Sequence, residues 1–317
     1  MKALTLTPDG PRLEARREKP AAAGEALLKI WQAGVCSTDL ELAKGYMNFT
    51  GVLGHEFVAT VESAPDTKLL GNRVVGEINC VCSACDLCQR GLRAHCRNRT
   101  VLGILDRDGC FAEYTRLPAE NLHVLPDTID DDAAVFVEPL AAAIQVTKQV
   151  RFDEKTWVTV LGDGRLGLLV AQVVRNAGAP VRLLGRHPQK LALAERWQVR
   201  SRNVADVKPR SDQDVVIDCT GSTAGLELAL SLCRPRGTVV LKSTVAADKP
   251  MNLAKAVVDE ITIVGSRCGP FRDAIAALAN GSIDVASLIH KRMKLDNAVE
   301  ALELAGRPGV LKVILTM

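Results

Sequence analysis

A short apolar run leading directly into a glycine-rich loop and then a helix-like stretch is the feature that most constrains this fold. The run is Trp157–Leu161, and the helix-like stretch is Leu166–Ala177. The loop between them consists of Gly162, Asp163, Gly164, Arg165, Leu166 and Gly167. G-x-G-x-x-G alone is a weak signal, but between a strand and a helix it predicts a dinucleotide site, with the pyrophosphate at the helix start. The alternative is a plain strand-to-helix turn.

Apolar runs alternate with helical stretches from about residue 155 onward, as in a doubly wound parallel α/β sheet. Each run is short and continuous, which is typical of a strand buried on both faces. The runs are Trp157–Leu161, Val181–Leu184, Asp214–Asp218, Thr238–Leu241 and Ile261–Val264. Before about residue 130, β-like runs broken by Gly, Pro and Asp predict an irregular antiparallel, barrel-like domain. These runs are Ala26–Ile30, Phe57–Glu62, Arg73–Ile78 and Phe111–Leu117.

The end of the second strand bears on cofactor choice. An NAD site usually has an acidic residue there, which bonds the ribose 2′-hydroxyl. This chain instead reads G-R-H-P-Q-K over Gly185–Lys190, with no carboxylate. Gly185 leaves room for a 2′-phosphate, which Arg186 can clamp with His187 or Lys190 nearby. We predict that NADP is preferred over NAD; the alternative is that Arg186 and Lys190 belong only to a solvated helix start.

Four cysteines at C-x2-C-x2-C-x7-C spacing form a second motif. They are Cys82, Cys85, Cys88 and Cys96. Four thiolates close the coordination sphere of zinc, so this pattern predicts a structural ion without chemistry of its own. A pair of disulfides is the alternative, but Met1–Asp9 has no apolar region of the length that a signal peptide needs. We therefore expect a cytoplasmic protein with reduced thiols.

A mixed set of metal-binding side chains lies upstream of the four cysteines. Cys36-Ser37-Thr38-Asp39 is followed by Gly54-His55-Glu56. Cys36 offers a thiolate, His55 an imidazole and Glu56 a carboxylate, and three protein ligands plus a water make an open, catalytic zinc site. Such a metal polarises a bound alcohol or carbonyl oxygen. Taken singly, Cys36 and His55 would be ordinary core residues, but the combination predicts chemistry.

In this order, the motifs resemble those of zinc-dependent medium-chain dehydrogenases/reductases, the alcohol, sorbitol, threonine and glucose dehydrogenase family. The resemblance extends over essentially the whole chain. It is carried by Cys36–Asp39, Gly54–Glu56, Gly71–Val74, the four cysteines, Val137–Leu140, Gly162–Gly167 and Gly265–Ser266. It implies a GroES-like catalytic domain over 1–143 with the zinc lobe at 80–97, a Rossmann domain over 144–267 and a return segment over 268–317.

The resemblance also implies residue roles. Cys36 and His55 would bind the catalytic zinc, with Glu56 and Glu138 completing the site. Glu138 stands where the alcohol branch has a cysteine and the polyol and glucose branches often have glutamate, which favours a polyol, sugar or other hydroxylated substrate. Asp39 would hold the second nitrogen of His55. Further cofactor contacts are assigned to Thr220, Gly265 and Ser266.

Thr38 would relay the substrate proton through the cofactor ribose, because a hydroxyl can donate and accept at once. Where some relatives end this relay with histidine, the chain has Glu41. Ala59 and Asn72 also depart from the family pattern. Because the chain is short for the family, we expect trimmed substrate loops around Tyr46–Thr50 and near residues 267–272.

Composition narrows the range of partners. The net charge of +3 is small beside 77 charged residues, giving no reason to expect nucleic acid or an anionic membrane. No run reaches the roughly 18 apolar residues of a membrane span. We expect an enzyme for a small alcohol or carbonyl compound, with two zinc ions per chain, and by family resemblance a homodimer or homotetramer. The alternatives are a zinc-free quinone or enone reductase on the same fold and a non-enzymatic nucleotide-binding zinc protein.

Overall fold

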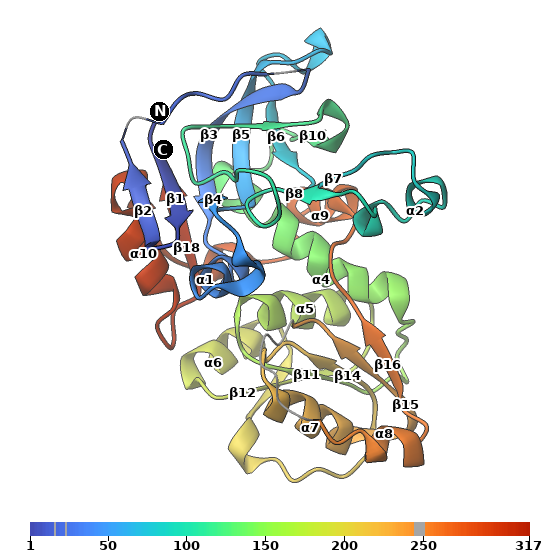
Figure 1. Cartoon of the computed structure of the whole chain (residues 1–317). Coiled ribbons are helices and arrows are strands. Elements are labelled where there is room, and N and C mark those ends of the chain that lie inside the picture. The colour runs from blue at the N-terminus through green and yellow to red at the C-terminus, as the bar shows by residue number, and fades with distance from the viewer. Residues whose placement is uncertain (16, 23, 244–250) are drawn as a thin grey trace. The chain divides into compact units, whose positions relative to one another are not determined.

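The computed structural model describes residues 1–15, 17–22, 24–243 and 251–317. It divides into two compact units (Figure 1). The first unit contains Met1–Glu138 together with Ile275–Met317, so the two ends of the chain fold together. The second is the continuous segment Pro139–Ala274. The chain therefore leaves the first unit, forms the second, and returns.

The described residues of the first unit form three sheets. The largest has the path β10-β6-β5-β3-β18-β17, with β9 also on β3; the others are β2-β1-β4 and β7-β8. The strands of the three sheets together are β1 (Ala3–Thr7), β2 (Gly10–Glu14), β3 (Ala26–Gly34), β4 (Gly51–Val52), β5 (Glu56–Ser63), β6 (Arg73–Gly76), β7 (Asn79–Cys80), β8 (Thr100–Val101), β9 (Tyr114–Leu117), β10 (Leu122–Val124), β17 (Ile289–Lys294) and β18 (Lys312–Thr316). Because β18 pairs with β3, the C-terminal strand folds back onto the largest sheet of the first unit.

The β3–β5 pair positions the chemically important residues of this unit. The two strands are antiparallel, and Gly34 at the end of β3 lies opposite Glu56 at the start of β5. Cys36, two residues after β3, is therefore brought to the same end of the sheet as His55, one residue before β5. Gly34 has to be glycine, since a Cβ there would collide with the Glu56 carboxylate and with Val135.

Short helices complete the first unit, and two longer helices contain the points in the sequence where one unit ends and the other begins. α1 starts immediately after Cys36, whose backbone N–H is capped by Asp39. α4 and α9 each contain a boundary of the two units. The helices are α1 (Ser37–Ala43), α2 (Asp86–Gln89), α3 (Asp131–Ala134), α4 (Val137–Gln149), α9 (Phe271–Ala279) and α10 (Ala298–Ala305).

The second unit is a doubly wound parallel sheet of order β13-β12-β11-β14-β15-β16. Its elements are β11 (Val158–Leu161), α5 (Arg165–Asn176), β12 (Val181–Gly185), α6 (Pro188–Arg196), β13 (Arg200–Asn203), β14 (Gln213–Asp218), α7 (Thr223–Leu232), β15 (Cys233–Leu241), α8 (Ala254–Val258) and β16 (Thr262–Gly265). The strand order changes direction between β11 and β14, which is where such sheets bind nucleotides. The predicted fold class is confirmed, although the sequence reading did not include β13, because that strand is polar and only partly buried.

Across the described helices of both units, none is both long enough and apolar enough to cross a membrane.

Candidate active site and metal centres

Cys36, His55 and Glu56 form a compact group in the first unit. One ligand atom from each lies within 4.8 Å of the other two. His55 and Glu56 are buried, whereas Cys36 is partly accessible. A thiolate, an imidazole and a carboxylate at such separations match the donor types that zinc takes in catalytic sites.

Asp39 contacts two members of this group, Cys36 and His55. Its Oδ2 accepts the Cys36 backbone N–H at 2.8 Å, and its Oδ1 lies 3.2 Å from Nδ1 of His55. Asp39 is completely buried, so its charge acts without much screening. Burial lowers the pKa of His55, but Asp39 and Cys36 raise it by more, and the net direction is well above 6.5. This negative environment favours a cation beside the imidazole.

Lys312 is part of the same neighbourhood, and the sequence analysis missed it. Its Nζ forms an ion pair with Oε2 of Glu56 and lies 3.4 Å from the carbonyl oxygen of Val35. Lys312 and Glu56 are each only 1% exposed. The Phe136 ring centre is 5.5 Å from the ammonium group. A lysine inside the strongly apolar run L-K-V-I-L was the available signal, because a buried charge requires a partner.

The residues present fit a zinc ion. Oε1 of Glu56 is buried without a hydrogen-bond partner, although the other oxygen of the same carboxylate faces Lys312. An orphaned carboxylate oxygen beside a thiol and an imidazole is a feature that a metal ligand would explain. Cys36, His55 and Glu56 are therefore the candidate ligands. Glu138, the expected fourth ligand, is not part of this three-residue group and remains a prediction.

The four cysteines of the lobe also come together. Neighbouring sulfur atoms are 3.5 Å apart for Cys85–Cys88 and Cys82–Cys96, and 3.8 Å apart for Cys85–Cys96. Tetrahedral bonds of about 2.3 Å to zinc place sulfurs about 3.8 Å from each other, whereas a disulfide requires about 2.05 Å. The arrangement fits a structural zinc ion, and all four thiols are unbridged.

Backbone groups prepare this lobe for a cation. N–H groups of Ala84 and Cys85 lower the pKa of Cys82 to about 6. Those of Arg97 and Cys88 lower the pKa of Cys85. Desolvation and the neighbouring thiols raise the pKa of Cys88 to about 12. Thiolate character is thus concentrated on part of the group, as expected where several thiols share one counter-ion.

The glycine loop lies between β11 and α5 in the second unit, as predicted. Gly162 has φ of 101°, a conformation that L residues rarely adopt, and a Cβ on Gly167 would overlap the carbonyl oxygen of Gly162. Gly164 is the N-cap of α5 and has open space beside its Cα atom. These properties are the ones that let a backbone approach a pyrophosphate at a helix start.

The turn after β12 differs from expectation in one respect. The space beside Gly185, which we expected to be left for a 2′-phosphate, is filled by Asp163 from the glycine loop. A Cβ on Gly185 would lie 2.5 Å from both Cβ and Oδ2 of Asp163. The turn therefore does contain a carboxylate, but one supplied by the neighbouring strand end, and this explains the glycine without reference to a ligand.

Comparisons with known proteins agree with this geometry. Residues 22–127 match the alcohol dehydrogenase GroES-like domain, and residues 166–280 match the zinc-binding dehydrogenase domain. The chain is 31% identical to an L-threonine 3-dehydrogenase of Streptomyces avermitilis over 292 residues, 85% of each protein. The chain belongs to the zinc-type medium-chain dehydrogenase/reductase family. It is thus an oxidoreductase of the alcohol and polyol dehydrogenase class, as its motifs predict.

Two further relatives span almost the full length of this dehydrogenase. A sorbitol dehydrogenase of Halalkalibacterium halodurans is 27% identical over 341 aligned residues, which cover 100% of this chain and 99% of the relative. A zinc-binding dehydrogenase of Sinorhizobium meliloti 1021, solved with NADP, is 29% identical with a TM-score of 0.90, covering 100% and 99% of the two chains. The irregular β domain and the Rossmann-type sheet are therefore both the family's.

Other residues of the first unit, including the predicted relay residues Thr38 and Glu41, lie at the following positions in the structure. Thr38 lies next to the metal group, with its Oγ1 3.8 Å from Sγ of Cys36. Glu41 is ion-paired with Lys44 at 2.8 Å. Cys110 is buried, with its Sγ 3.7 Å from the Glu56 carbonyl oxygen. Burial and the charges of Asp39 and Glu56 raise its pKa well above 9.0, so it is a neutral thiol.

Three expected cofactor residues lie at carboxyl ends of strands in the dehydrogenase's second unit. The Thr220 backbone N–H bonds Oδ1 of Asp218 at the end of β14. Gly265 ends β16, and its carbonyl oxygen accepts from Gln149. Ser266 follows it and is buried. The carboxyl edge is where parallel sheets bind nucleotides, so their position agrees with a cofactor role.

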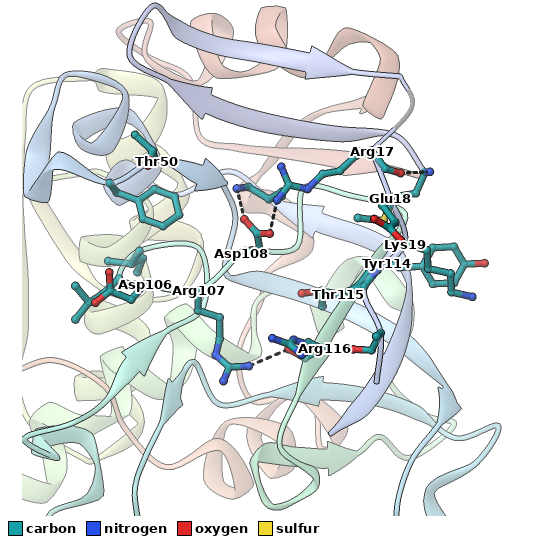
Figure 2. A pocket seen from close by; sticks show the side chains of 18 of the residues that line it. Arg17, Glu18, Lys19, Thr50, Asp106, Arg107, Asp108, Tyr114, Thr115 and Arg116 are labelled. Atoms are coloured by element: carbon teal, nitrogen blue, oxygen red, sulfur yellow. Dashed lines mark hydrogen bonds and ion pairs between the residues drawn. The ribbon is translucent and has the colours of Figure 1, made fainter. Parts of the chain in front are cut away.

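A cavity of about 830 Å³ lies elsewhere in the first unit (Figure 2). It includes Met47–Thr50 of the expected substrate loop, but none of the three metal-group residues lines it. Figure 2 shows Arg17 paired with Asp108, at 2.5 Å, and Arg107 directed at the carbonyl oxygen of Arg116. Arg107 also donates two hydrogen bonds of 3.0 Å to Glu25, so both cations already have partners. We assign no ligand to it.

Proposed function

We propose that this protein is a zinc-dependent dehydrogenase that transfers a hydride between NADP(H) and a polyol, sugar or other hydroxylated compound, or the corresponding carbonyl. The observation that supports this most directly is the Cys36, His55 and Glu56 group, with an orphaned carboxylate oxygen beside a thiol and an imidazole. A zinc-free reductase on the same fold would not need that combination.

The proposed roles of the protein's own residues follow from their contacts. Cys36 and His55 would hold zinc, with Glu56 and Glu138 as the oxygen ligands. Zinc, when bound, polarises the substrate oxygen. Asp39, whose Oδ1 lies 3.2 Å from Nδ1 of His55, would orient the imidazole so that its other nitrogen faces the metal. Lys312 offsets part of the Glu56 charge and restrains that carboxylate.

Thr38 is proposed to move the proton. A bound dinucleotide would supply the hydride acceptor for oxidation of an alcohol, and the substrate hydroxyl would then have to lose a proton. The Thr38 hydroxyl can accept that proton while donating its own onward. Removing this hydroxyl should lower kcat much more than cofactor affinity. Thr38→Val with full turnover would contradict the relay, and Thr38→Ser should retain most activity.

NADP is proposed as the preferred dinucleotide. Arg186 is exposed at the turn after β12, at the position where a 2′-phosphate would be met. Lys190, one turn into α6, adds a second cation. No residue of the turn itself carries an acid that would accept from a ribose 2′-hydroxyl.

A homodimer or homotetramer is also part of the proposal. β16 is an edge strand, and the adjoining α8 exposes Val257 and Val258, which are 76% and 79% accessible. Ile263 on β16 itself is also exposed. Adjacent exposed apolar residues at an open sheet edge are a feature that pairing with a second copy would cover.

We also propose a cytoplasmic location. All ten cysteines are unbridged, and thiols stay reduced in the cytosol.

The test combines metal analysis with a substrate panel. Purified protein should contain two zinc ions per chain and should change the absorbance of NADPH or NADP with some alcohols, polyols or carbonyls. Treatment with a chelator should abolish turnover, and added zinc should restore it. One zinc per chain with turnover unaffected by chelation would point to a zinc-free reductase. One zinc and no turnover would point to a nucleotide-binding protein without activity.

A further inference from the structure

We propose that Asp163 is a positioning residue that makes the protein select NADP over NAD. It does so by fixing the backbone of the turn Gly185–Pro188, so that only side chains are left to bind the 2′-phosphate of NADP. The inference rests on the proposed function, because it assumes that this unit binds a nicotinamide dinucleotide. It concerns residues of the second unit only.

Asp163 is tied to the turn by its whole carboxylate. Oδ2 accepts the backbone N–H of Arg186 at 2.8 Å and that of His187 at 2.7 Å. Nδ1 of His187 lies 3.0 Å from Oδ2 and 3.1 Å from Oδ1. Asp163 is only 7% exposed. Burial raises its pKa, but the His187 and Arg186 hydrogen bonds lower it by more, so the group is a carboxylate at neutral pH.

This carboxylate occupies the position of a missing side chain. Because a Cβ on Gly185 would lie 2.5 Å from Asp163, the two residues cannot both have side chains in that space. In an NAD enzyme the acid at this strand end accepts from the ribose hydroxyls. Here the acid comes from the neighbouring strand end, and its oxygens already accept from the turn. It is therefore a poor acceptor for a ribose 2′-hydroxyl.

The same bonds decide how a phosphate could be held. Backbone N–H groups after the second strand are natural anion donors, but those of Arg186 and His187 already donate to Asp163. A 2′-phosphate must then be bound by side chains. The exposed Arg186 suits a planar, two-point contact, and its direction depends on the backbone that Asp163 restrains.

Lys190, the third residue of α6, supplies a second cation in the same part of the unit. It is buried, and burial lowers its pKa, with Arg165 acting in the same direction and Asp163 opposing both. Lys190 is therefore influenced both by Asp163, whose carboxylate is already hydrogen-bonded, and by a second cation, Arg165. An additional anion beside these cations would be favourable, and a 2′-phosphate is the group by which NADP differs from NAD.

The experiment measures dissociation constants of NADPH and NADH by fluorescence titration of the full-length, zinc-containing protein. Wild type should select NADPH. Asp163→Ala should reduce the NADH-to-NADPH ratio of dissociation constants about tenfold, the effect of one charge-assisted hydrogen bond. Asp163→Asn, which can still accept from the turn, should recover most of the selectivity. Asp206→Ala is the charge-matched control, because Asp206 is exposed in the same unit, and it should leave the ratio unchanged.

A double variant tests the shared space. Gly185→Ala alone should weaken binding of both dinucleotides, whereas Gly185→Ala with Asp163→Gly should bind NADH nearly as well as Asp163→Gly does. Unfolding midpoints identify variants that fail to fold.

The outcomes separate the two proposals. If wild type selects NADPH and Asp163→Ala keeps the same ratio, the role of Asp163 is wrong and the proposed function stands. Equal weakening of both cofactors would likewise reduce Asp163 to a structural residue. If wild type binds neither dinucleotide, the proposed function itself fails. A wild type that prefers NADH overturns the NADP assignment and the role of Asp163 with it.

Discussion

The two candidate metal groups of the first unit are held in opposite ways. The lobe cysteines lie within fifteen residues of each other, are mostly exposed or half-buried, and receive backbone N–H groups from their own loop. The Cys36, His55 and Glu56 group is largely buried and depends on Asp39 and on Lys312, which is 256 residues away from Glu56 along the chain.

The lobe group is thus organised by contacts within one loop, whereas the buried group depends on contacts between segments that are far apart in the sequence. A loop that organises four identical donors can bind its ion with little help from the rest of the protein, and it leaves no position for a substrate. A buried mixed group needs compensating charges from distant strands, and one unsatisfied carboxylate oxygen remains available. We expect disruption of the first to affect mainly stability, and disruption of the second to affect mainly turnover.

Replacing a ligand of the buried group should have the largest effect. Cys36→Ser is expected to lower the zinc content from two ions to one per chain and to reduce turnover to the background of the assay, because the thiolate is lost. Elemental analysis and an NADPH absorbance assay measure both. Cys110→Ala is the matched control, since Cys110 is a buried neutral thiol nearby and should leave both ions in place. Two ions and normal turnover in Cys36→Ser would contradict the ligand assignment.

Replacing Asp39, which contacts His55 and Cys36, should have the second-largest effect. Asp39→Asn keeps the shape but removes the charge that orients His55, so zinc affinity at the buried group should fall about 10- to 100-fold. Competition with a chromogenic chelator measures this, and the lobe ion serves as an internal reference. Asp86→Asn, which alters an exposed acid of the lobe paired with Arg97, should have no such effect. Similar affinity losses in both variants would mean that the two groups are not independent.

A lobe variant tests the other half of the comparison. Cys88→Ser should release one zinc ion and lower the unfolding midpoint by several degrees, because metal binding contributes to folding and each 1 kcal/mol shifts the midpoint by about 2–4 °C in a domain of this size. Turnover per remaining ion should stay close to wild type. Differential scanning calorimetry and steady-state assays at low temperature provide the measurements. Complete loss of turnover in folded protein would refute the separation of roles.

The smallest expected effect is a difference in alkylation between two cysteines, Cys82 and Cys80, after the metal has been removed. In chelated protein, Cys82 is expected to react with iodoacetamide at pH 7, with its rate rising through pH about 6, because backbone N–H groups lower its pKa to about 6. Cys80 lies nearby in the sequence, but burial raises its pKa to about 11, so it should stay unmodified. Peptide mass spectrometry distinguishes the two. Equal labelling would show that the lobe loses its backbone arrangement without the ion.

The sequence was sufficient for features that depend on local spacing. The strand–loop–helix pattern at 157–177 predicts β11, the glycine loop and α5, because each step follows from neighbouring residues. The fold class and the family follow from the order of such motifs. The polar strand β13 could not be found this way, since its partner β12 decides its structure and its own residues have no apolar pattern.

The contacts around both sites depend on pairing between distant segments. Lys312 meets Glu56 only because β18 pairs with β3, and no local rule joins residues so far apart. Similarly, Gly185 and Asp163 lie together because β11 and β12 are parallel neighbours. The sequence indicated that Gly185 was unusual, but the cause, a carboxylate from the adjacent strand end, required the structure.

The return of β18 to β3 has a consequence for vectorial synthesis on the ribosome. Residues 139–274 are contiguous and can acquire their native sheet while the chain is still being elongated. The earlier-made segment cannot: its central sheet waits for Lys312–Thr316, and until then Glu56 has no counter-charge. The part translated first therefore matures last, and the nascent chain cannot complete the Lys312–Glu56 ion pair of its candidate metal group before residues 139–274 have been translated.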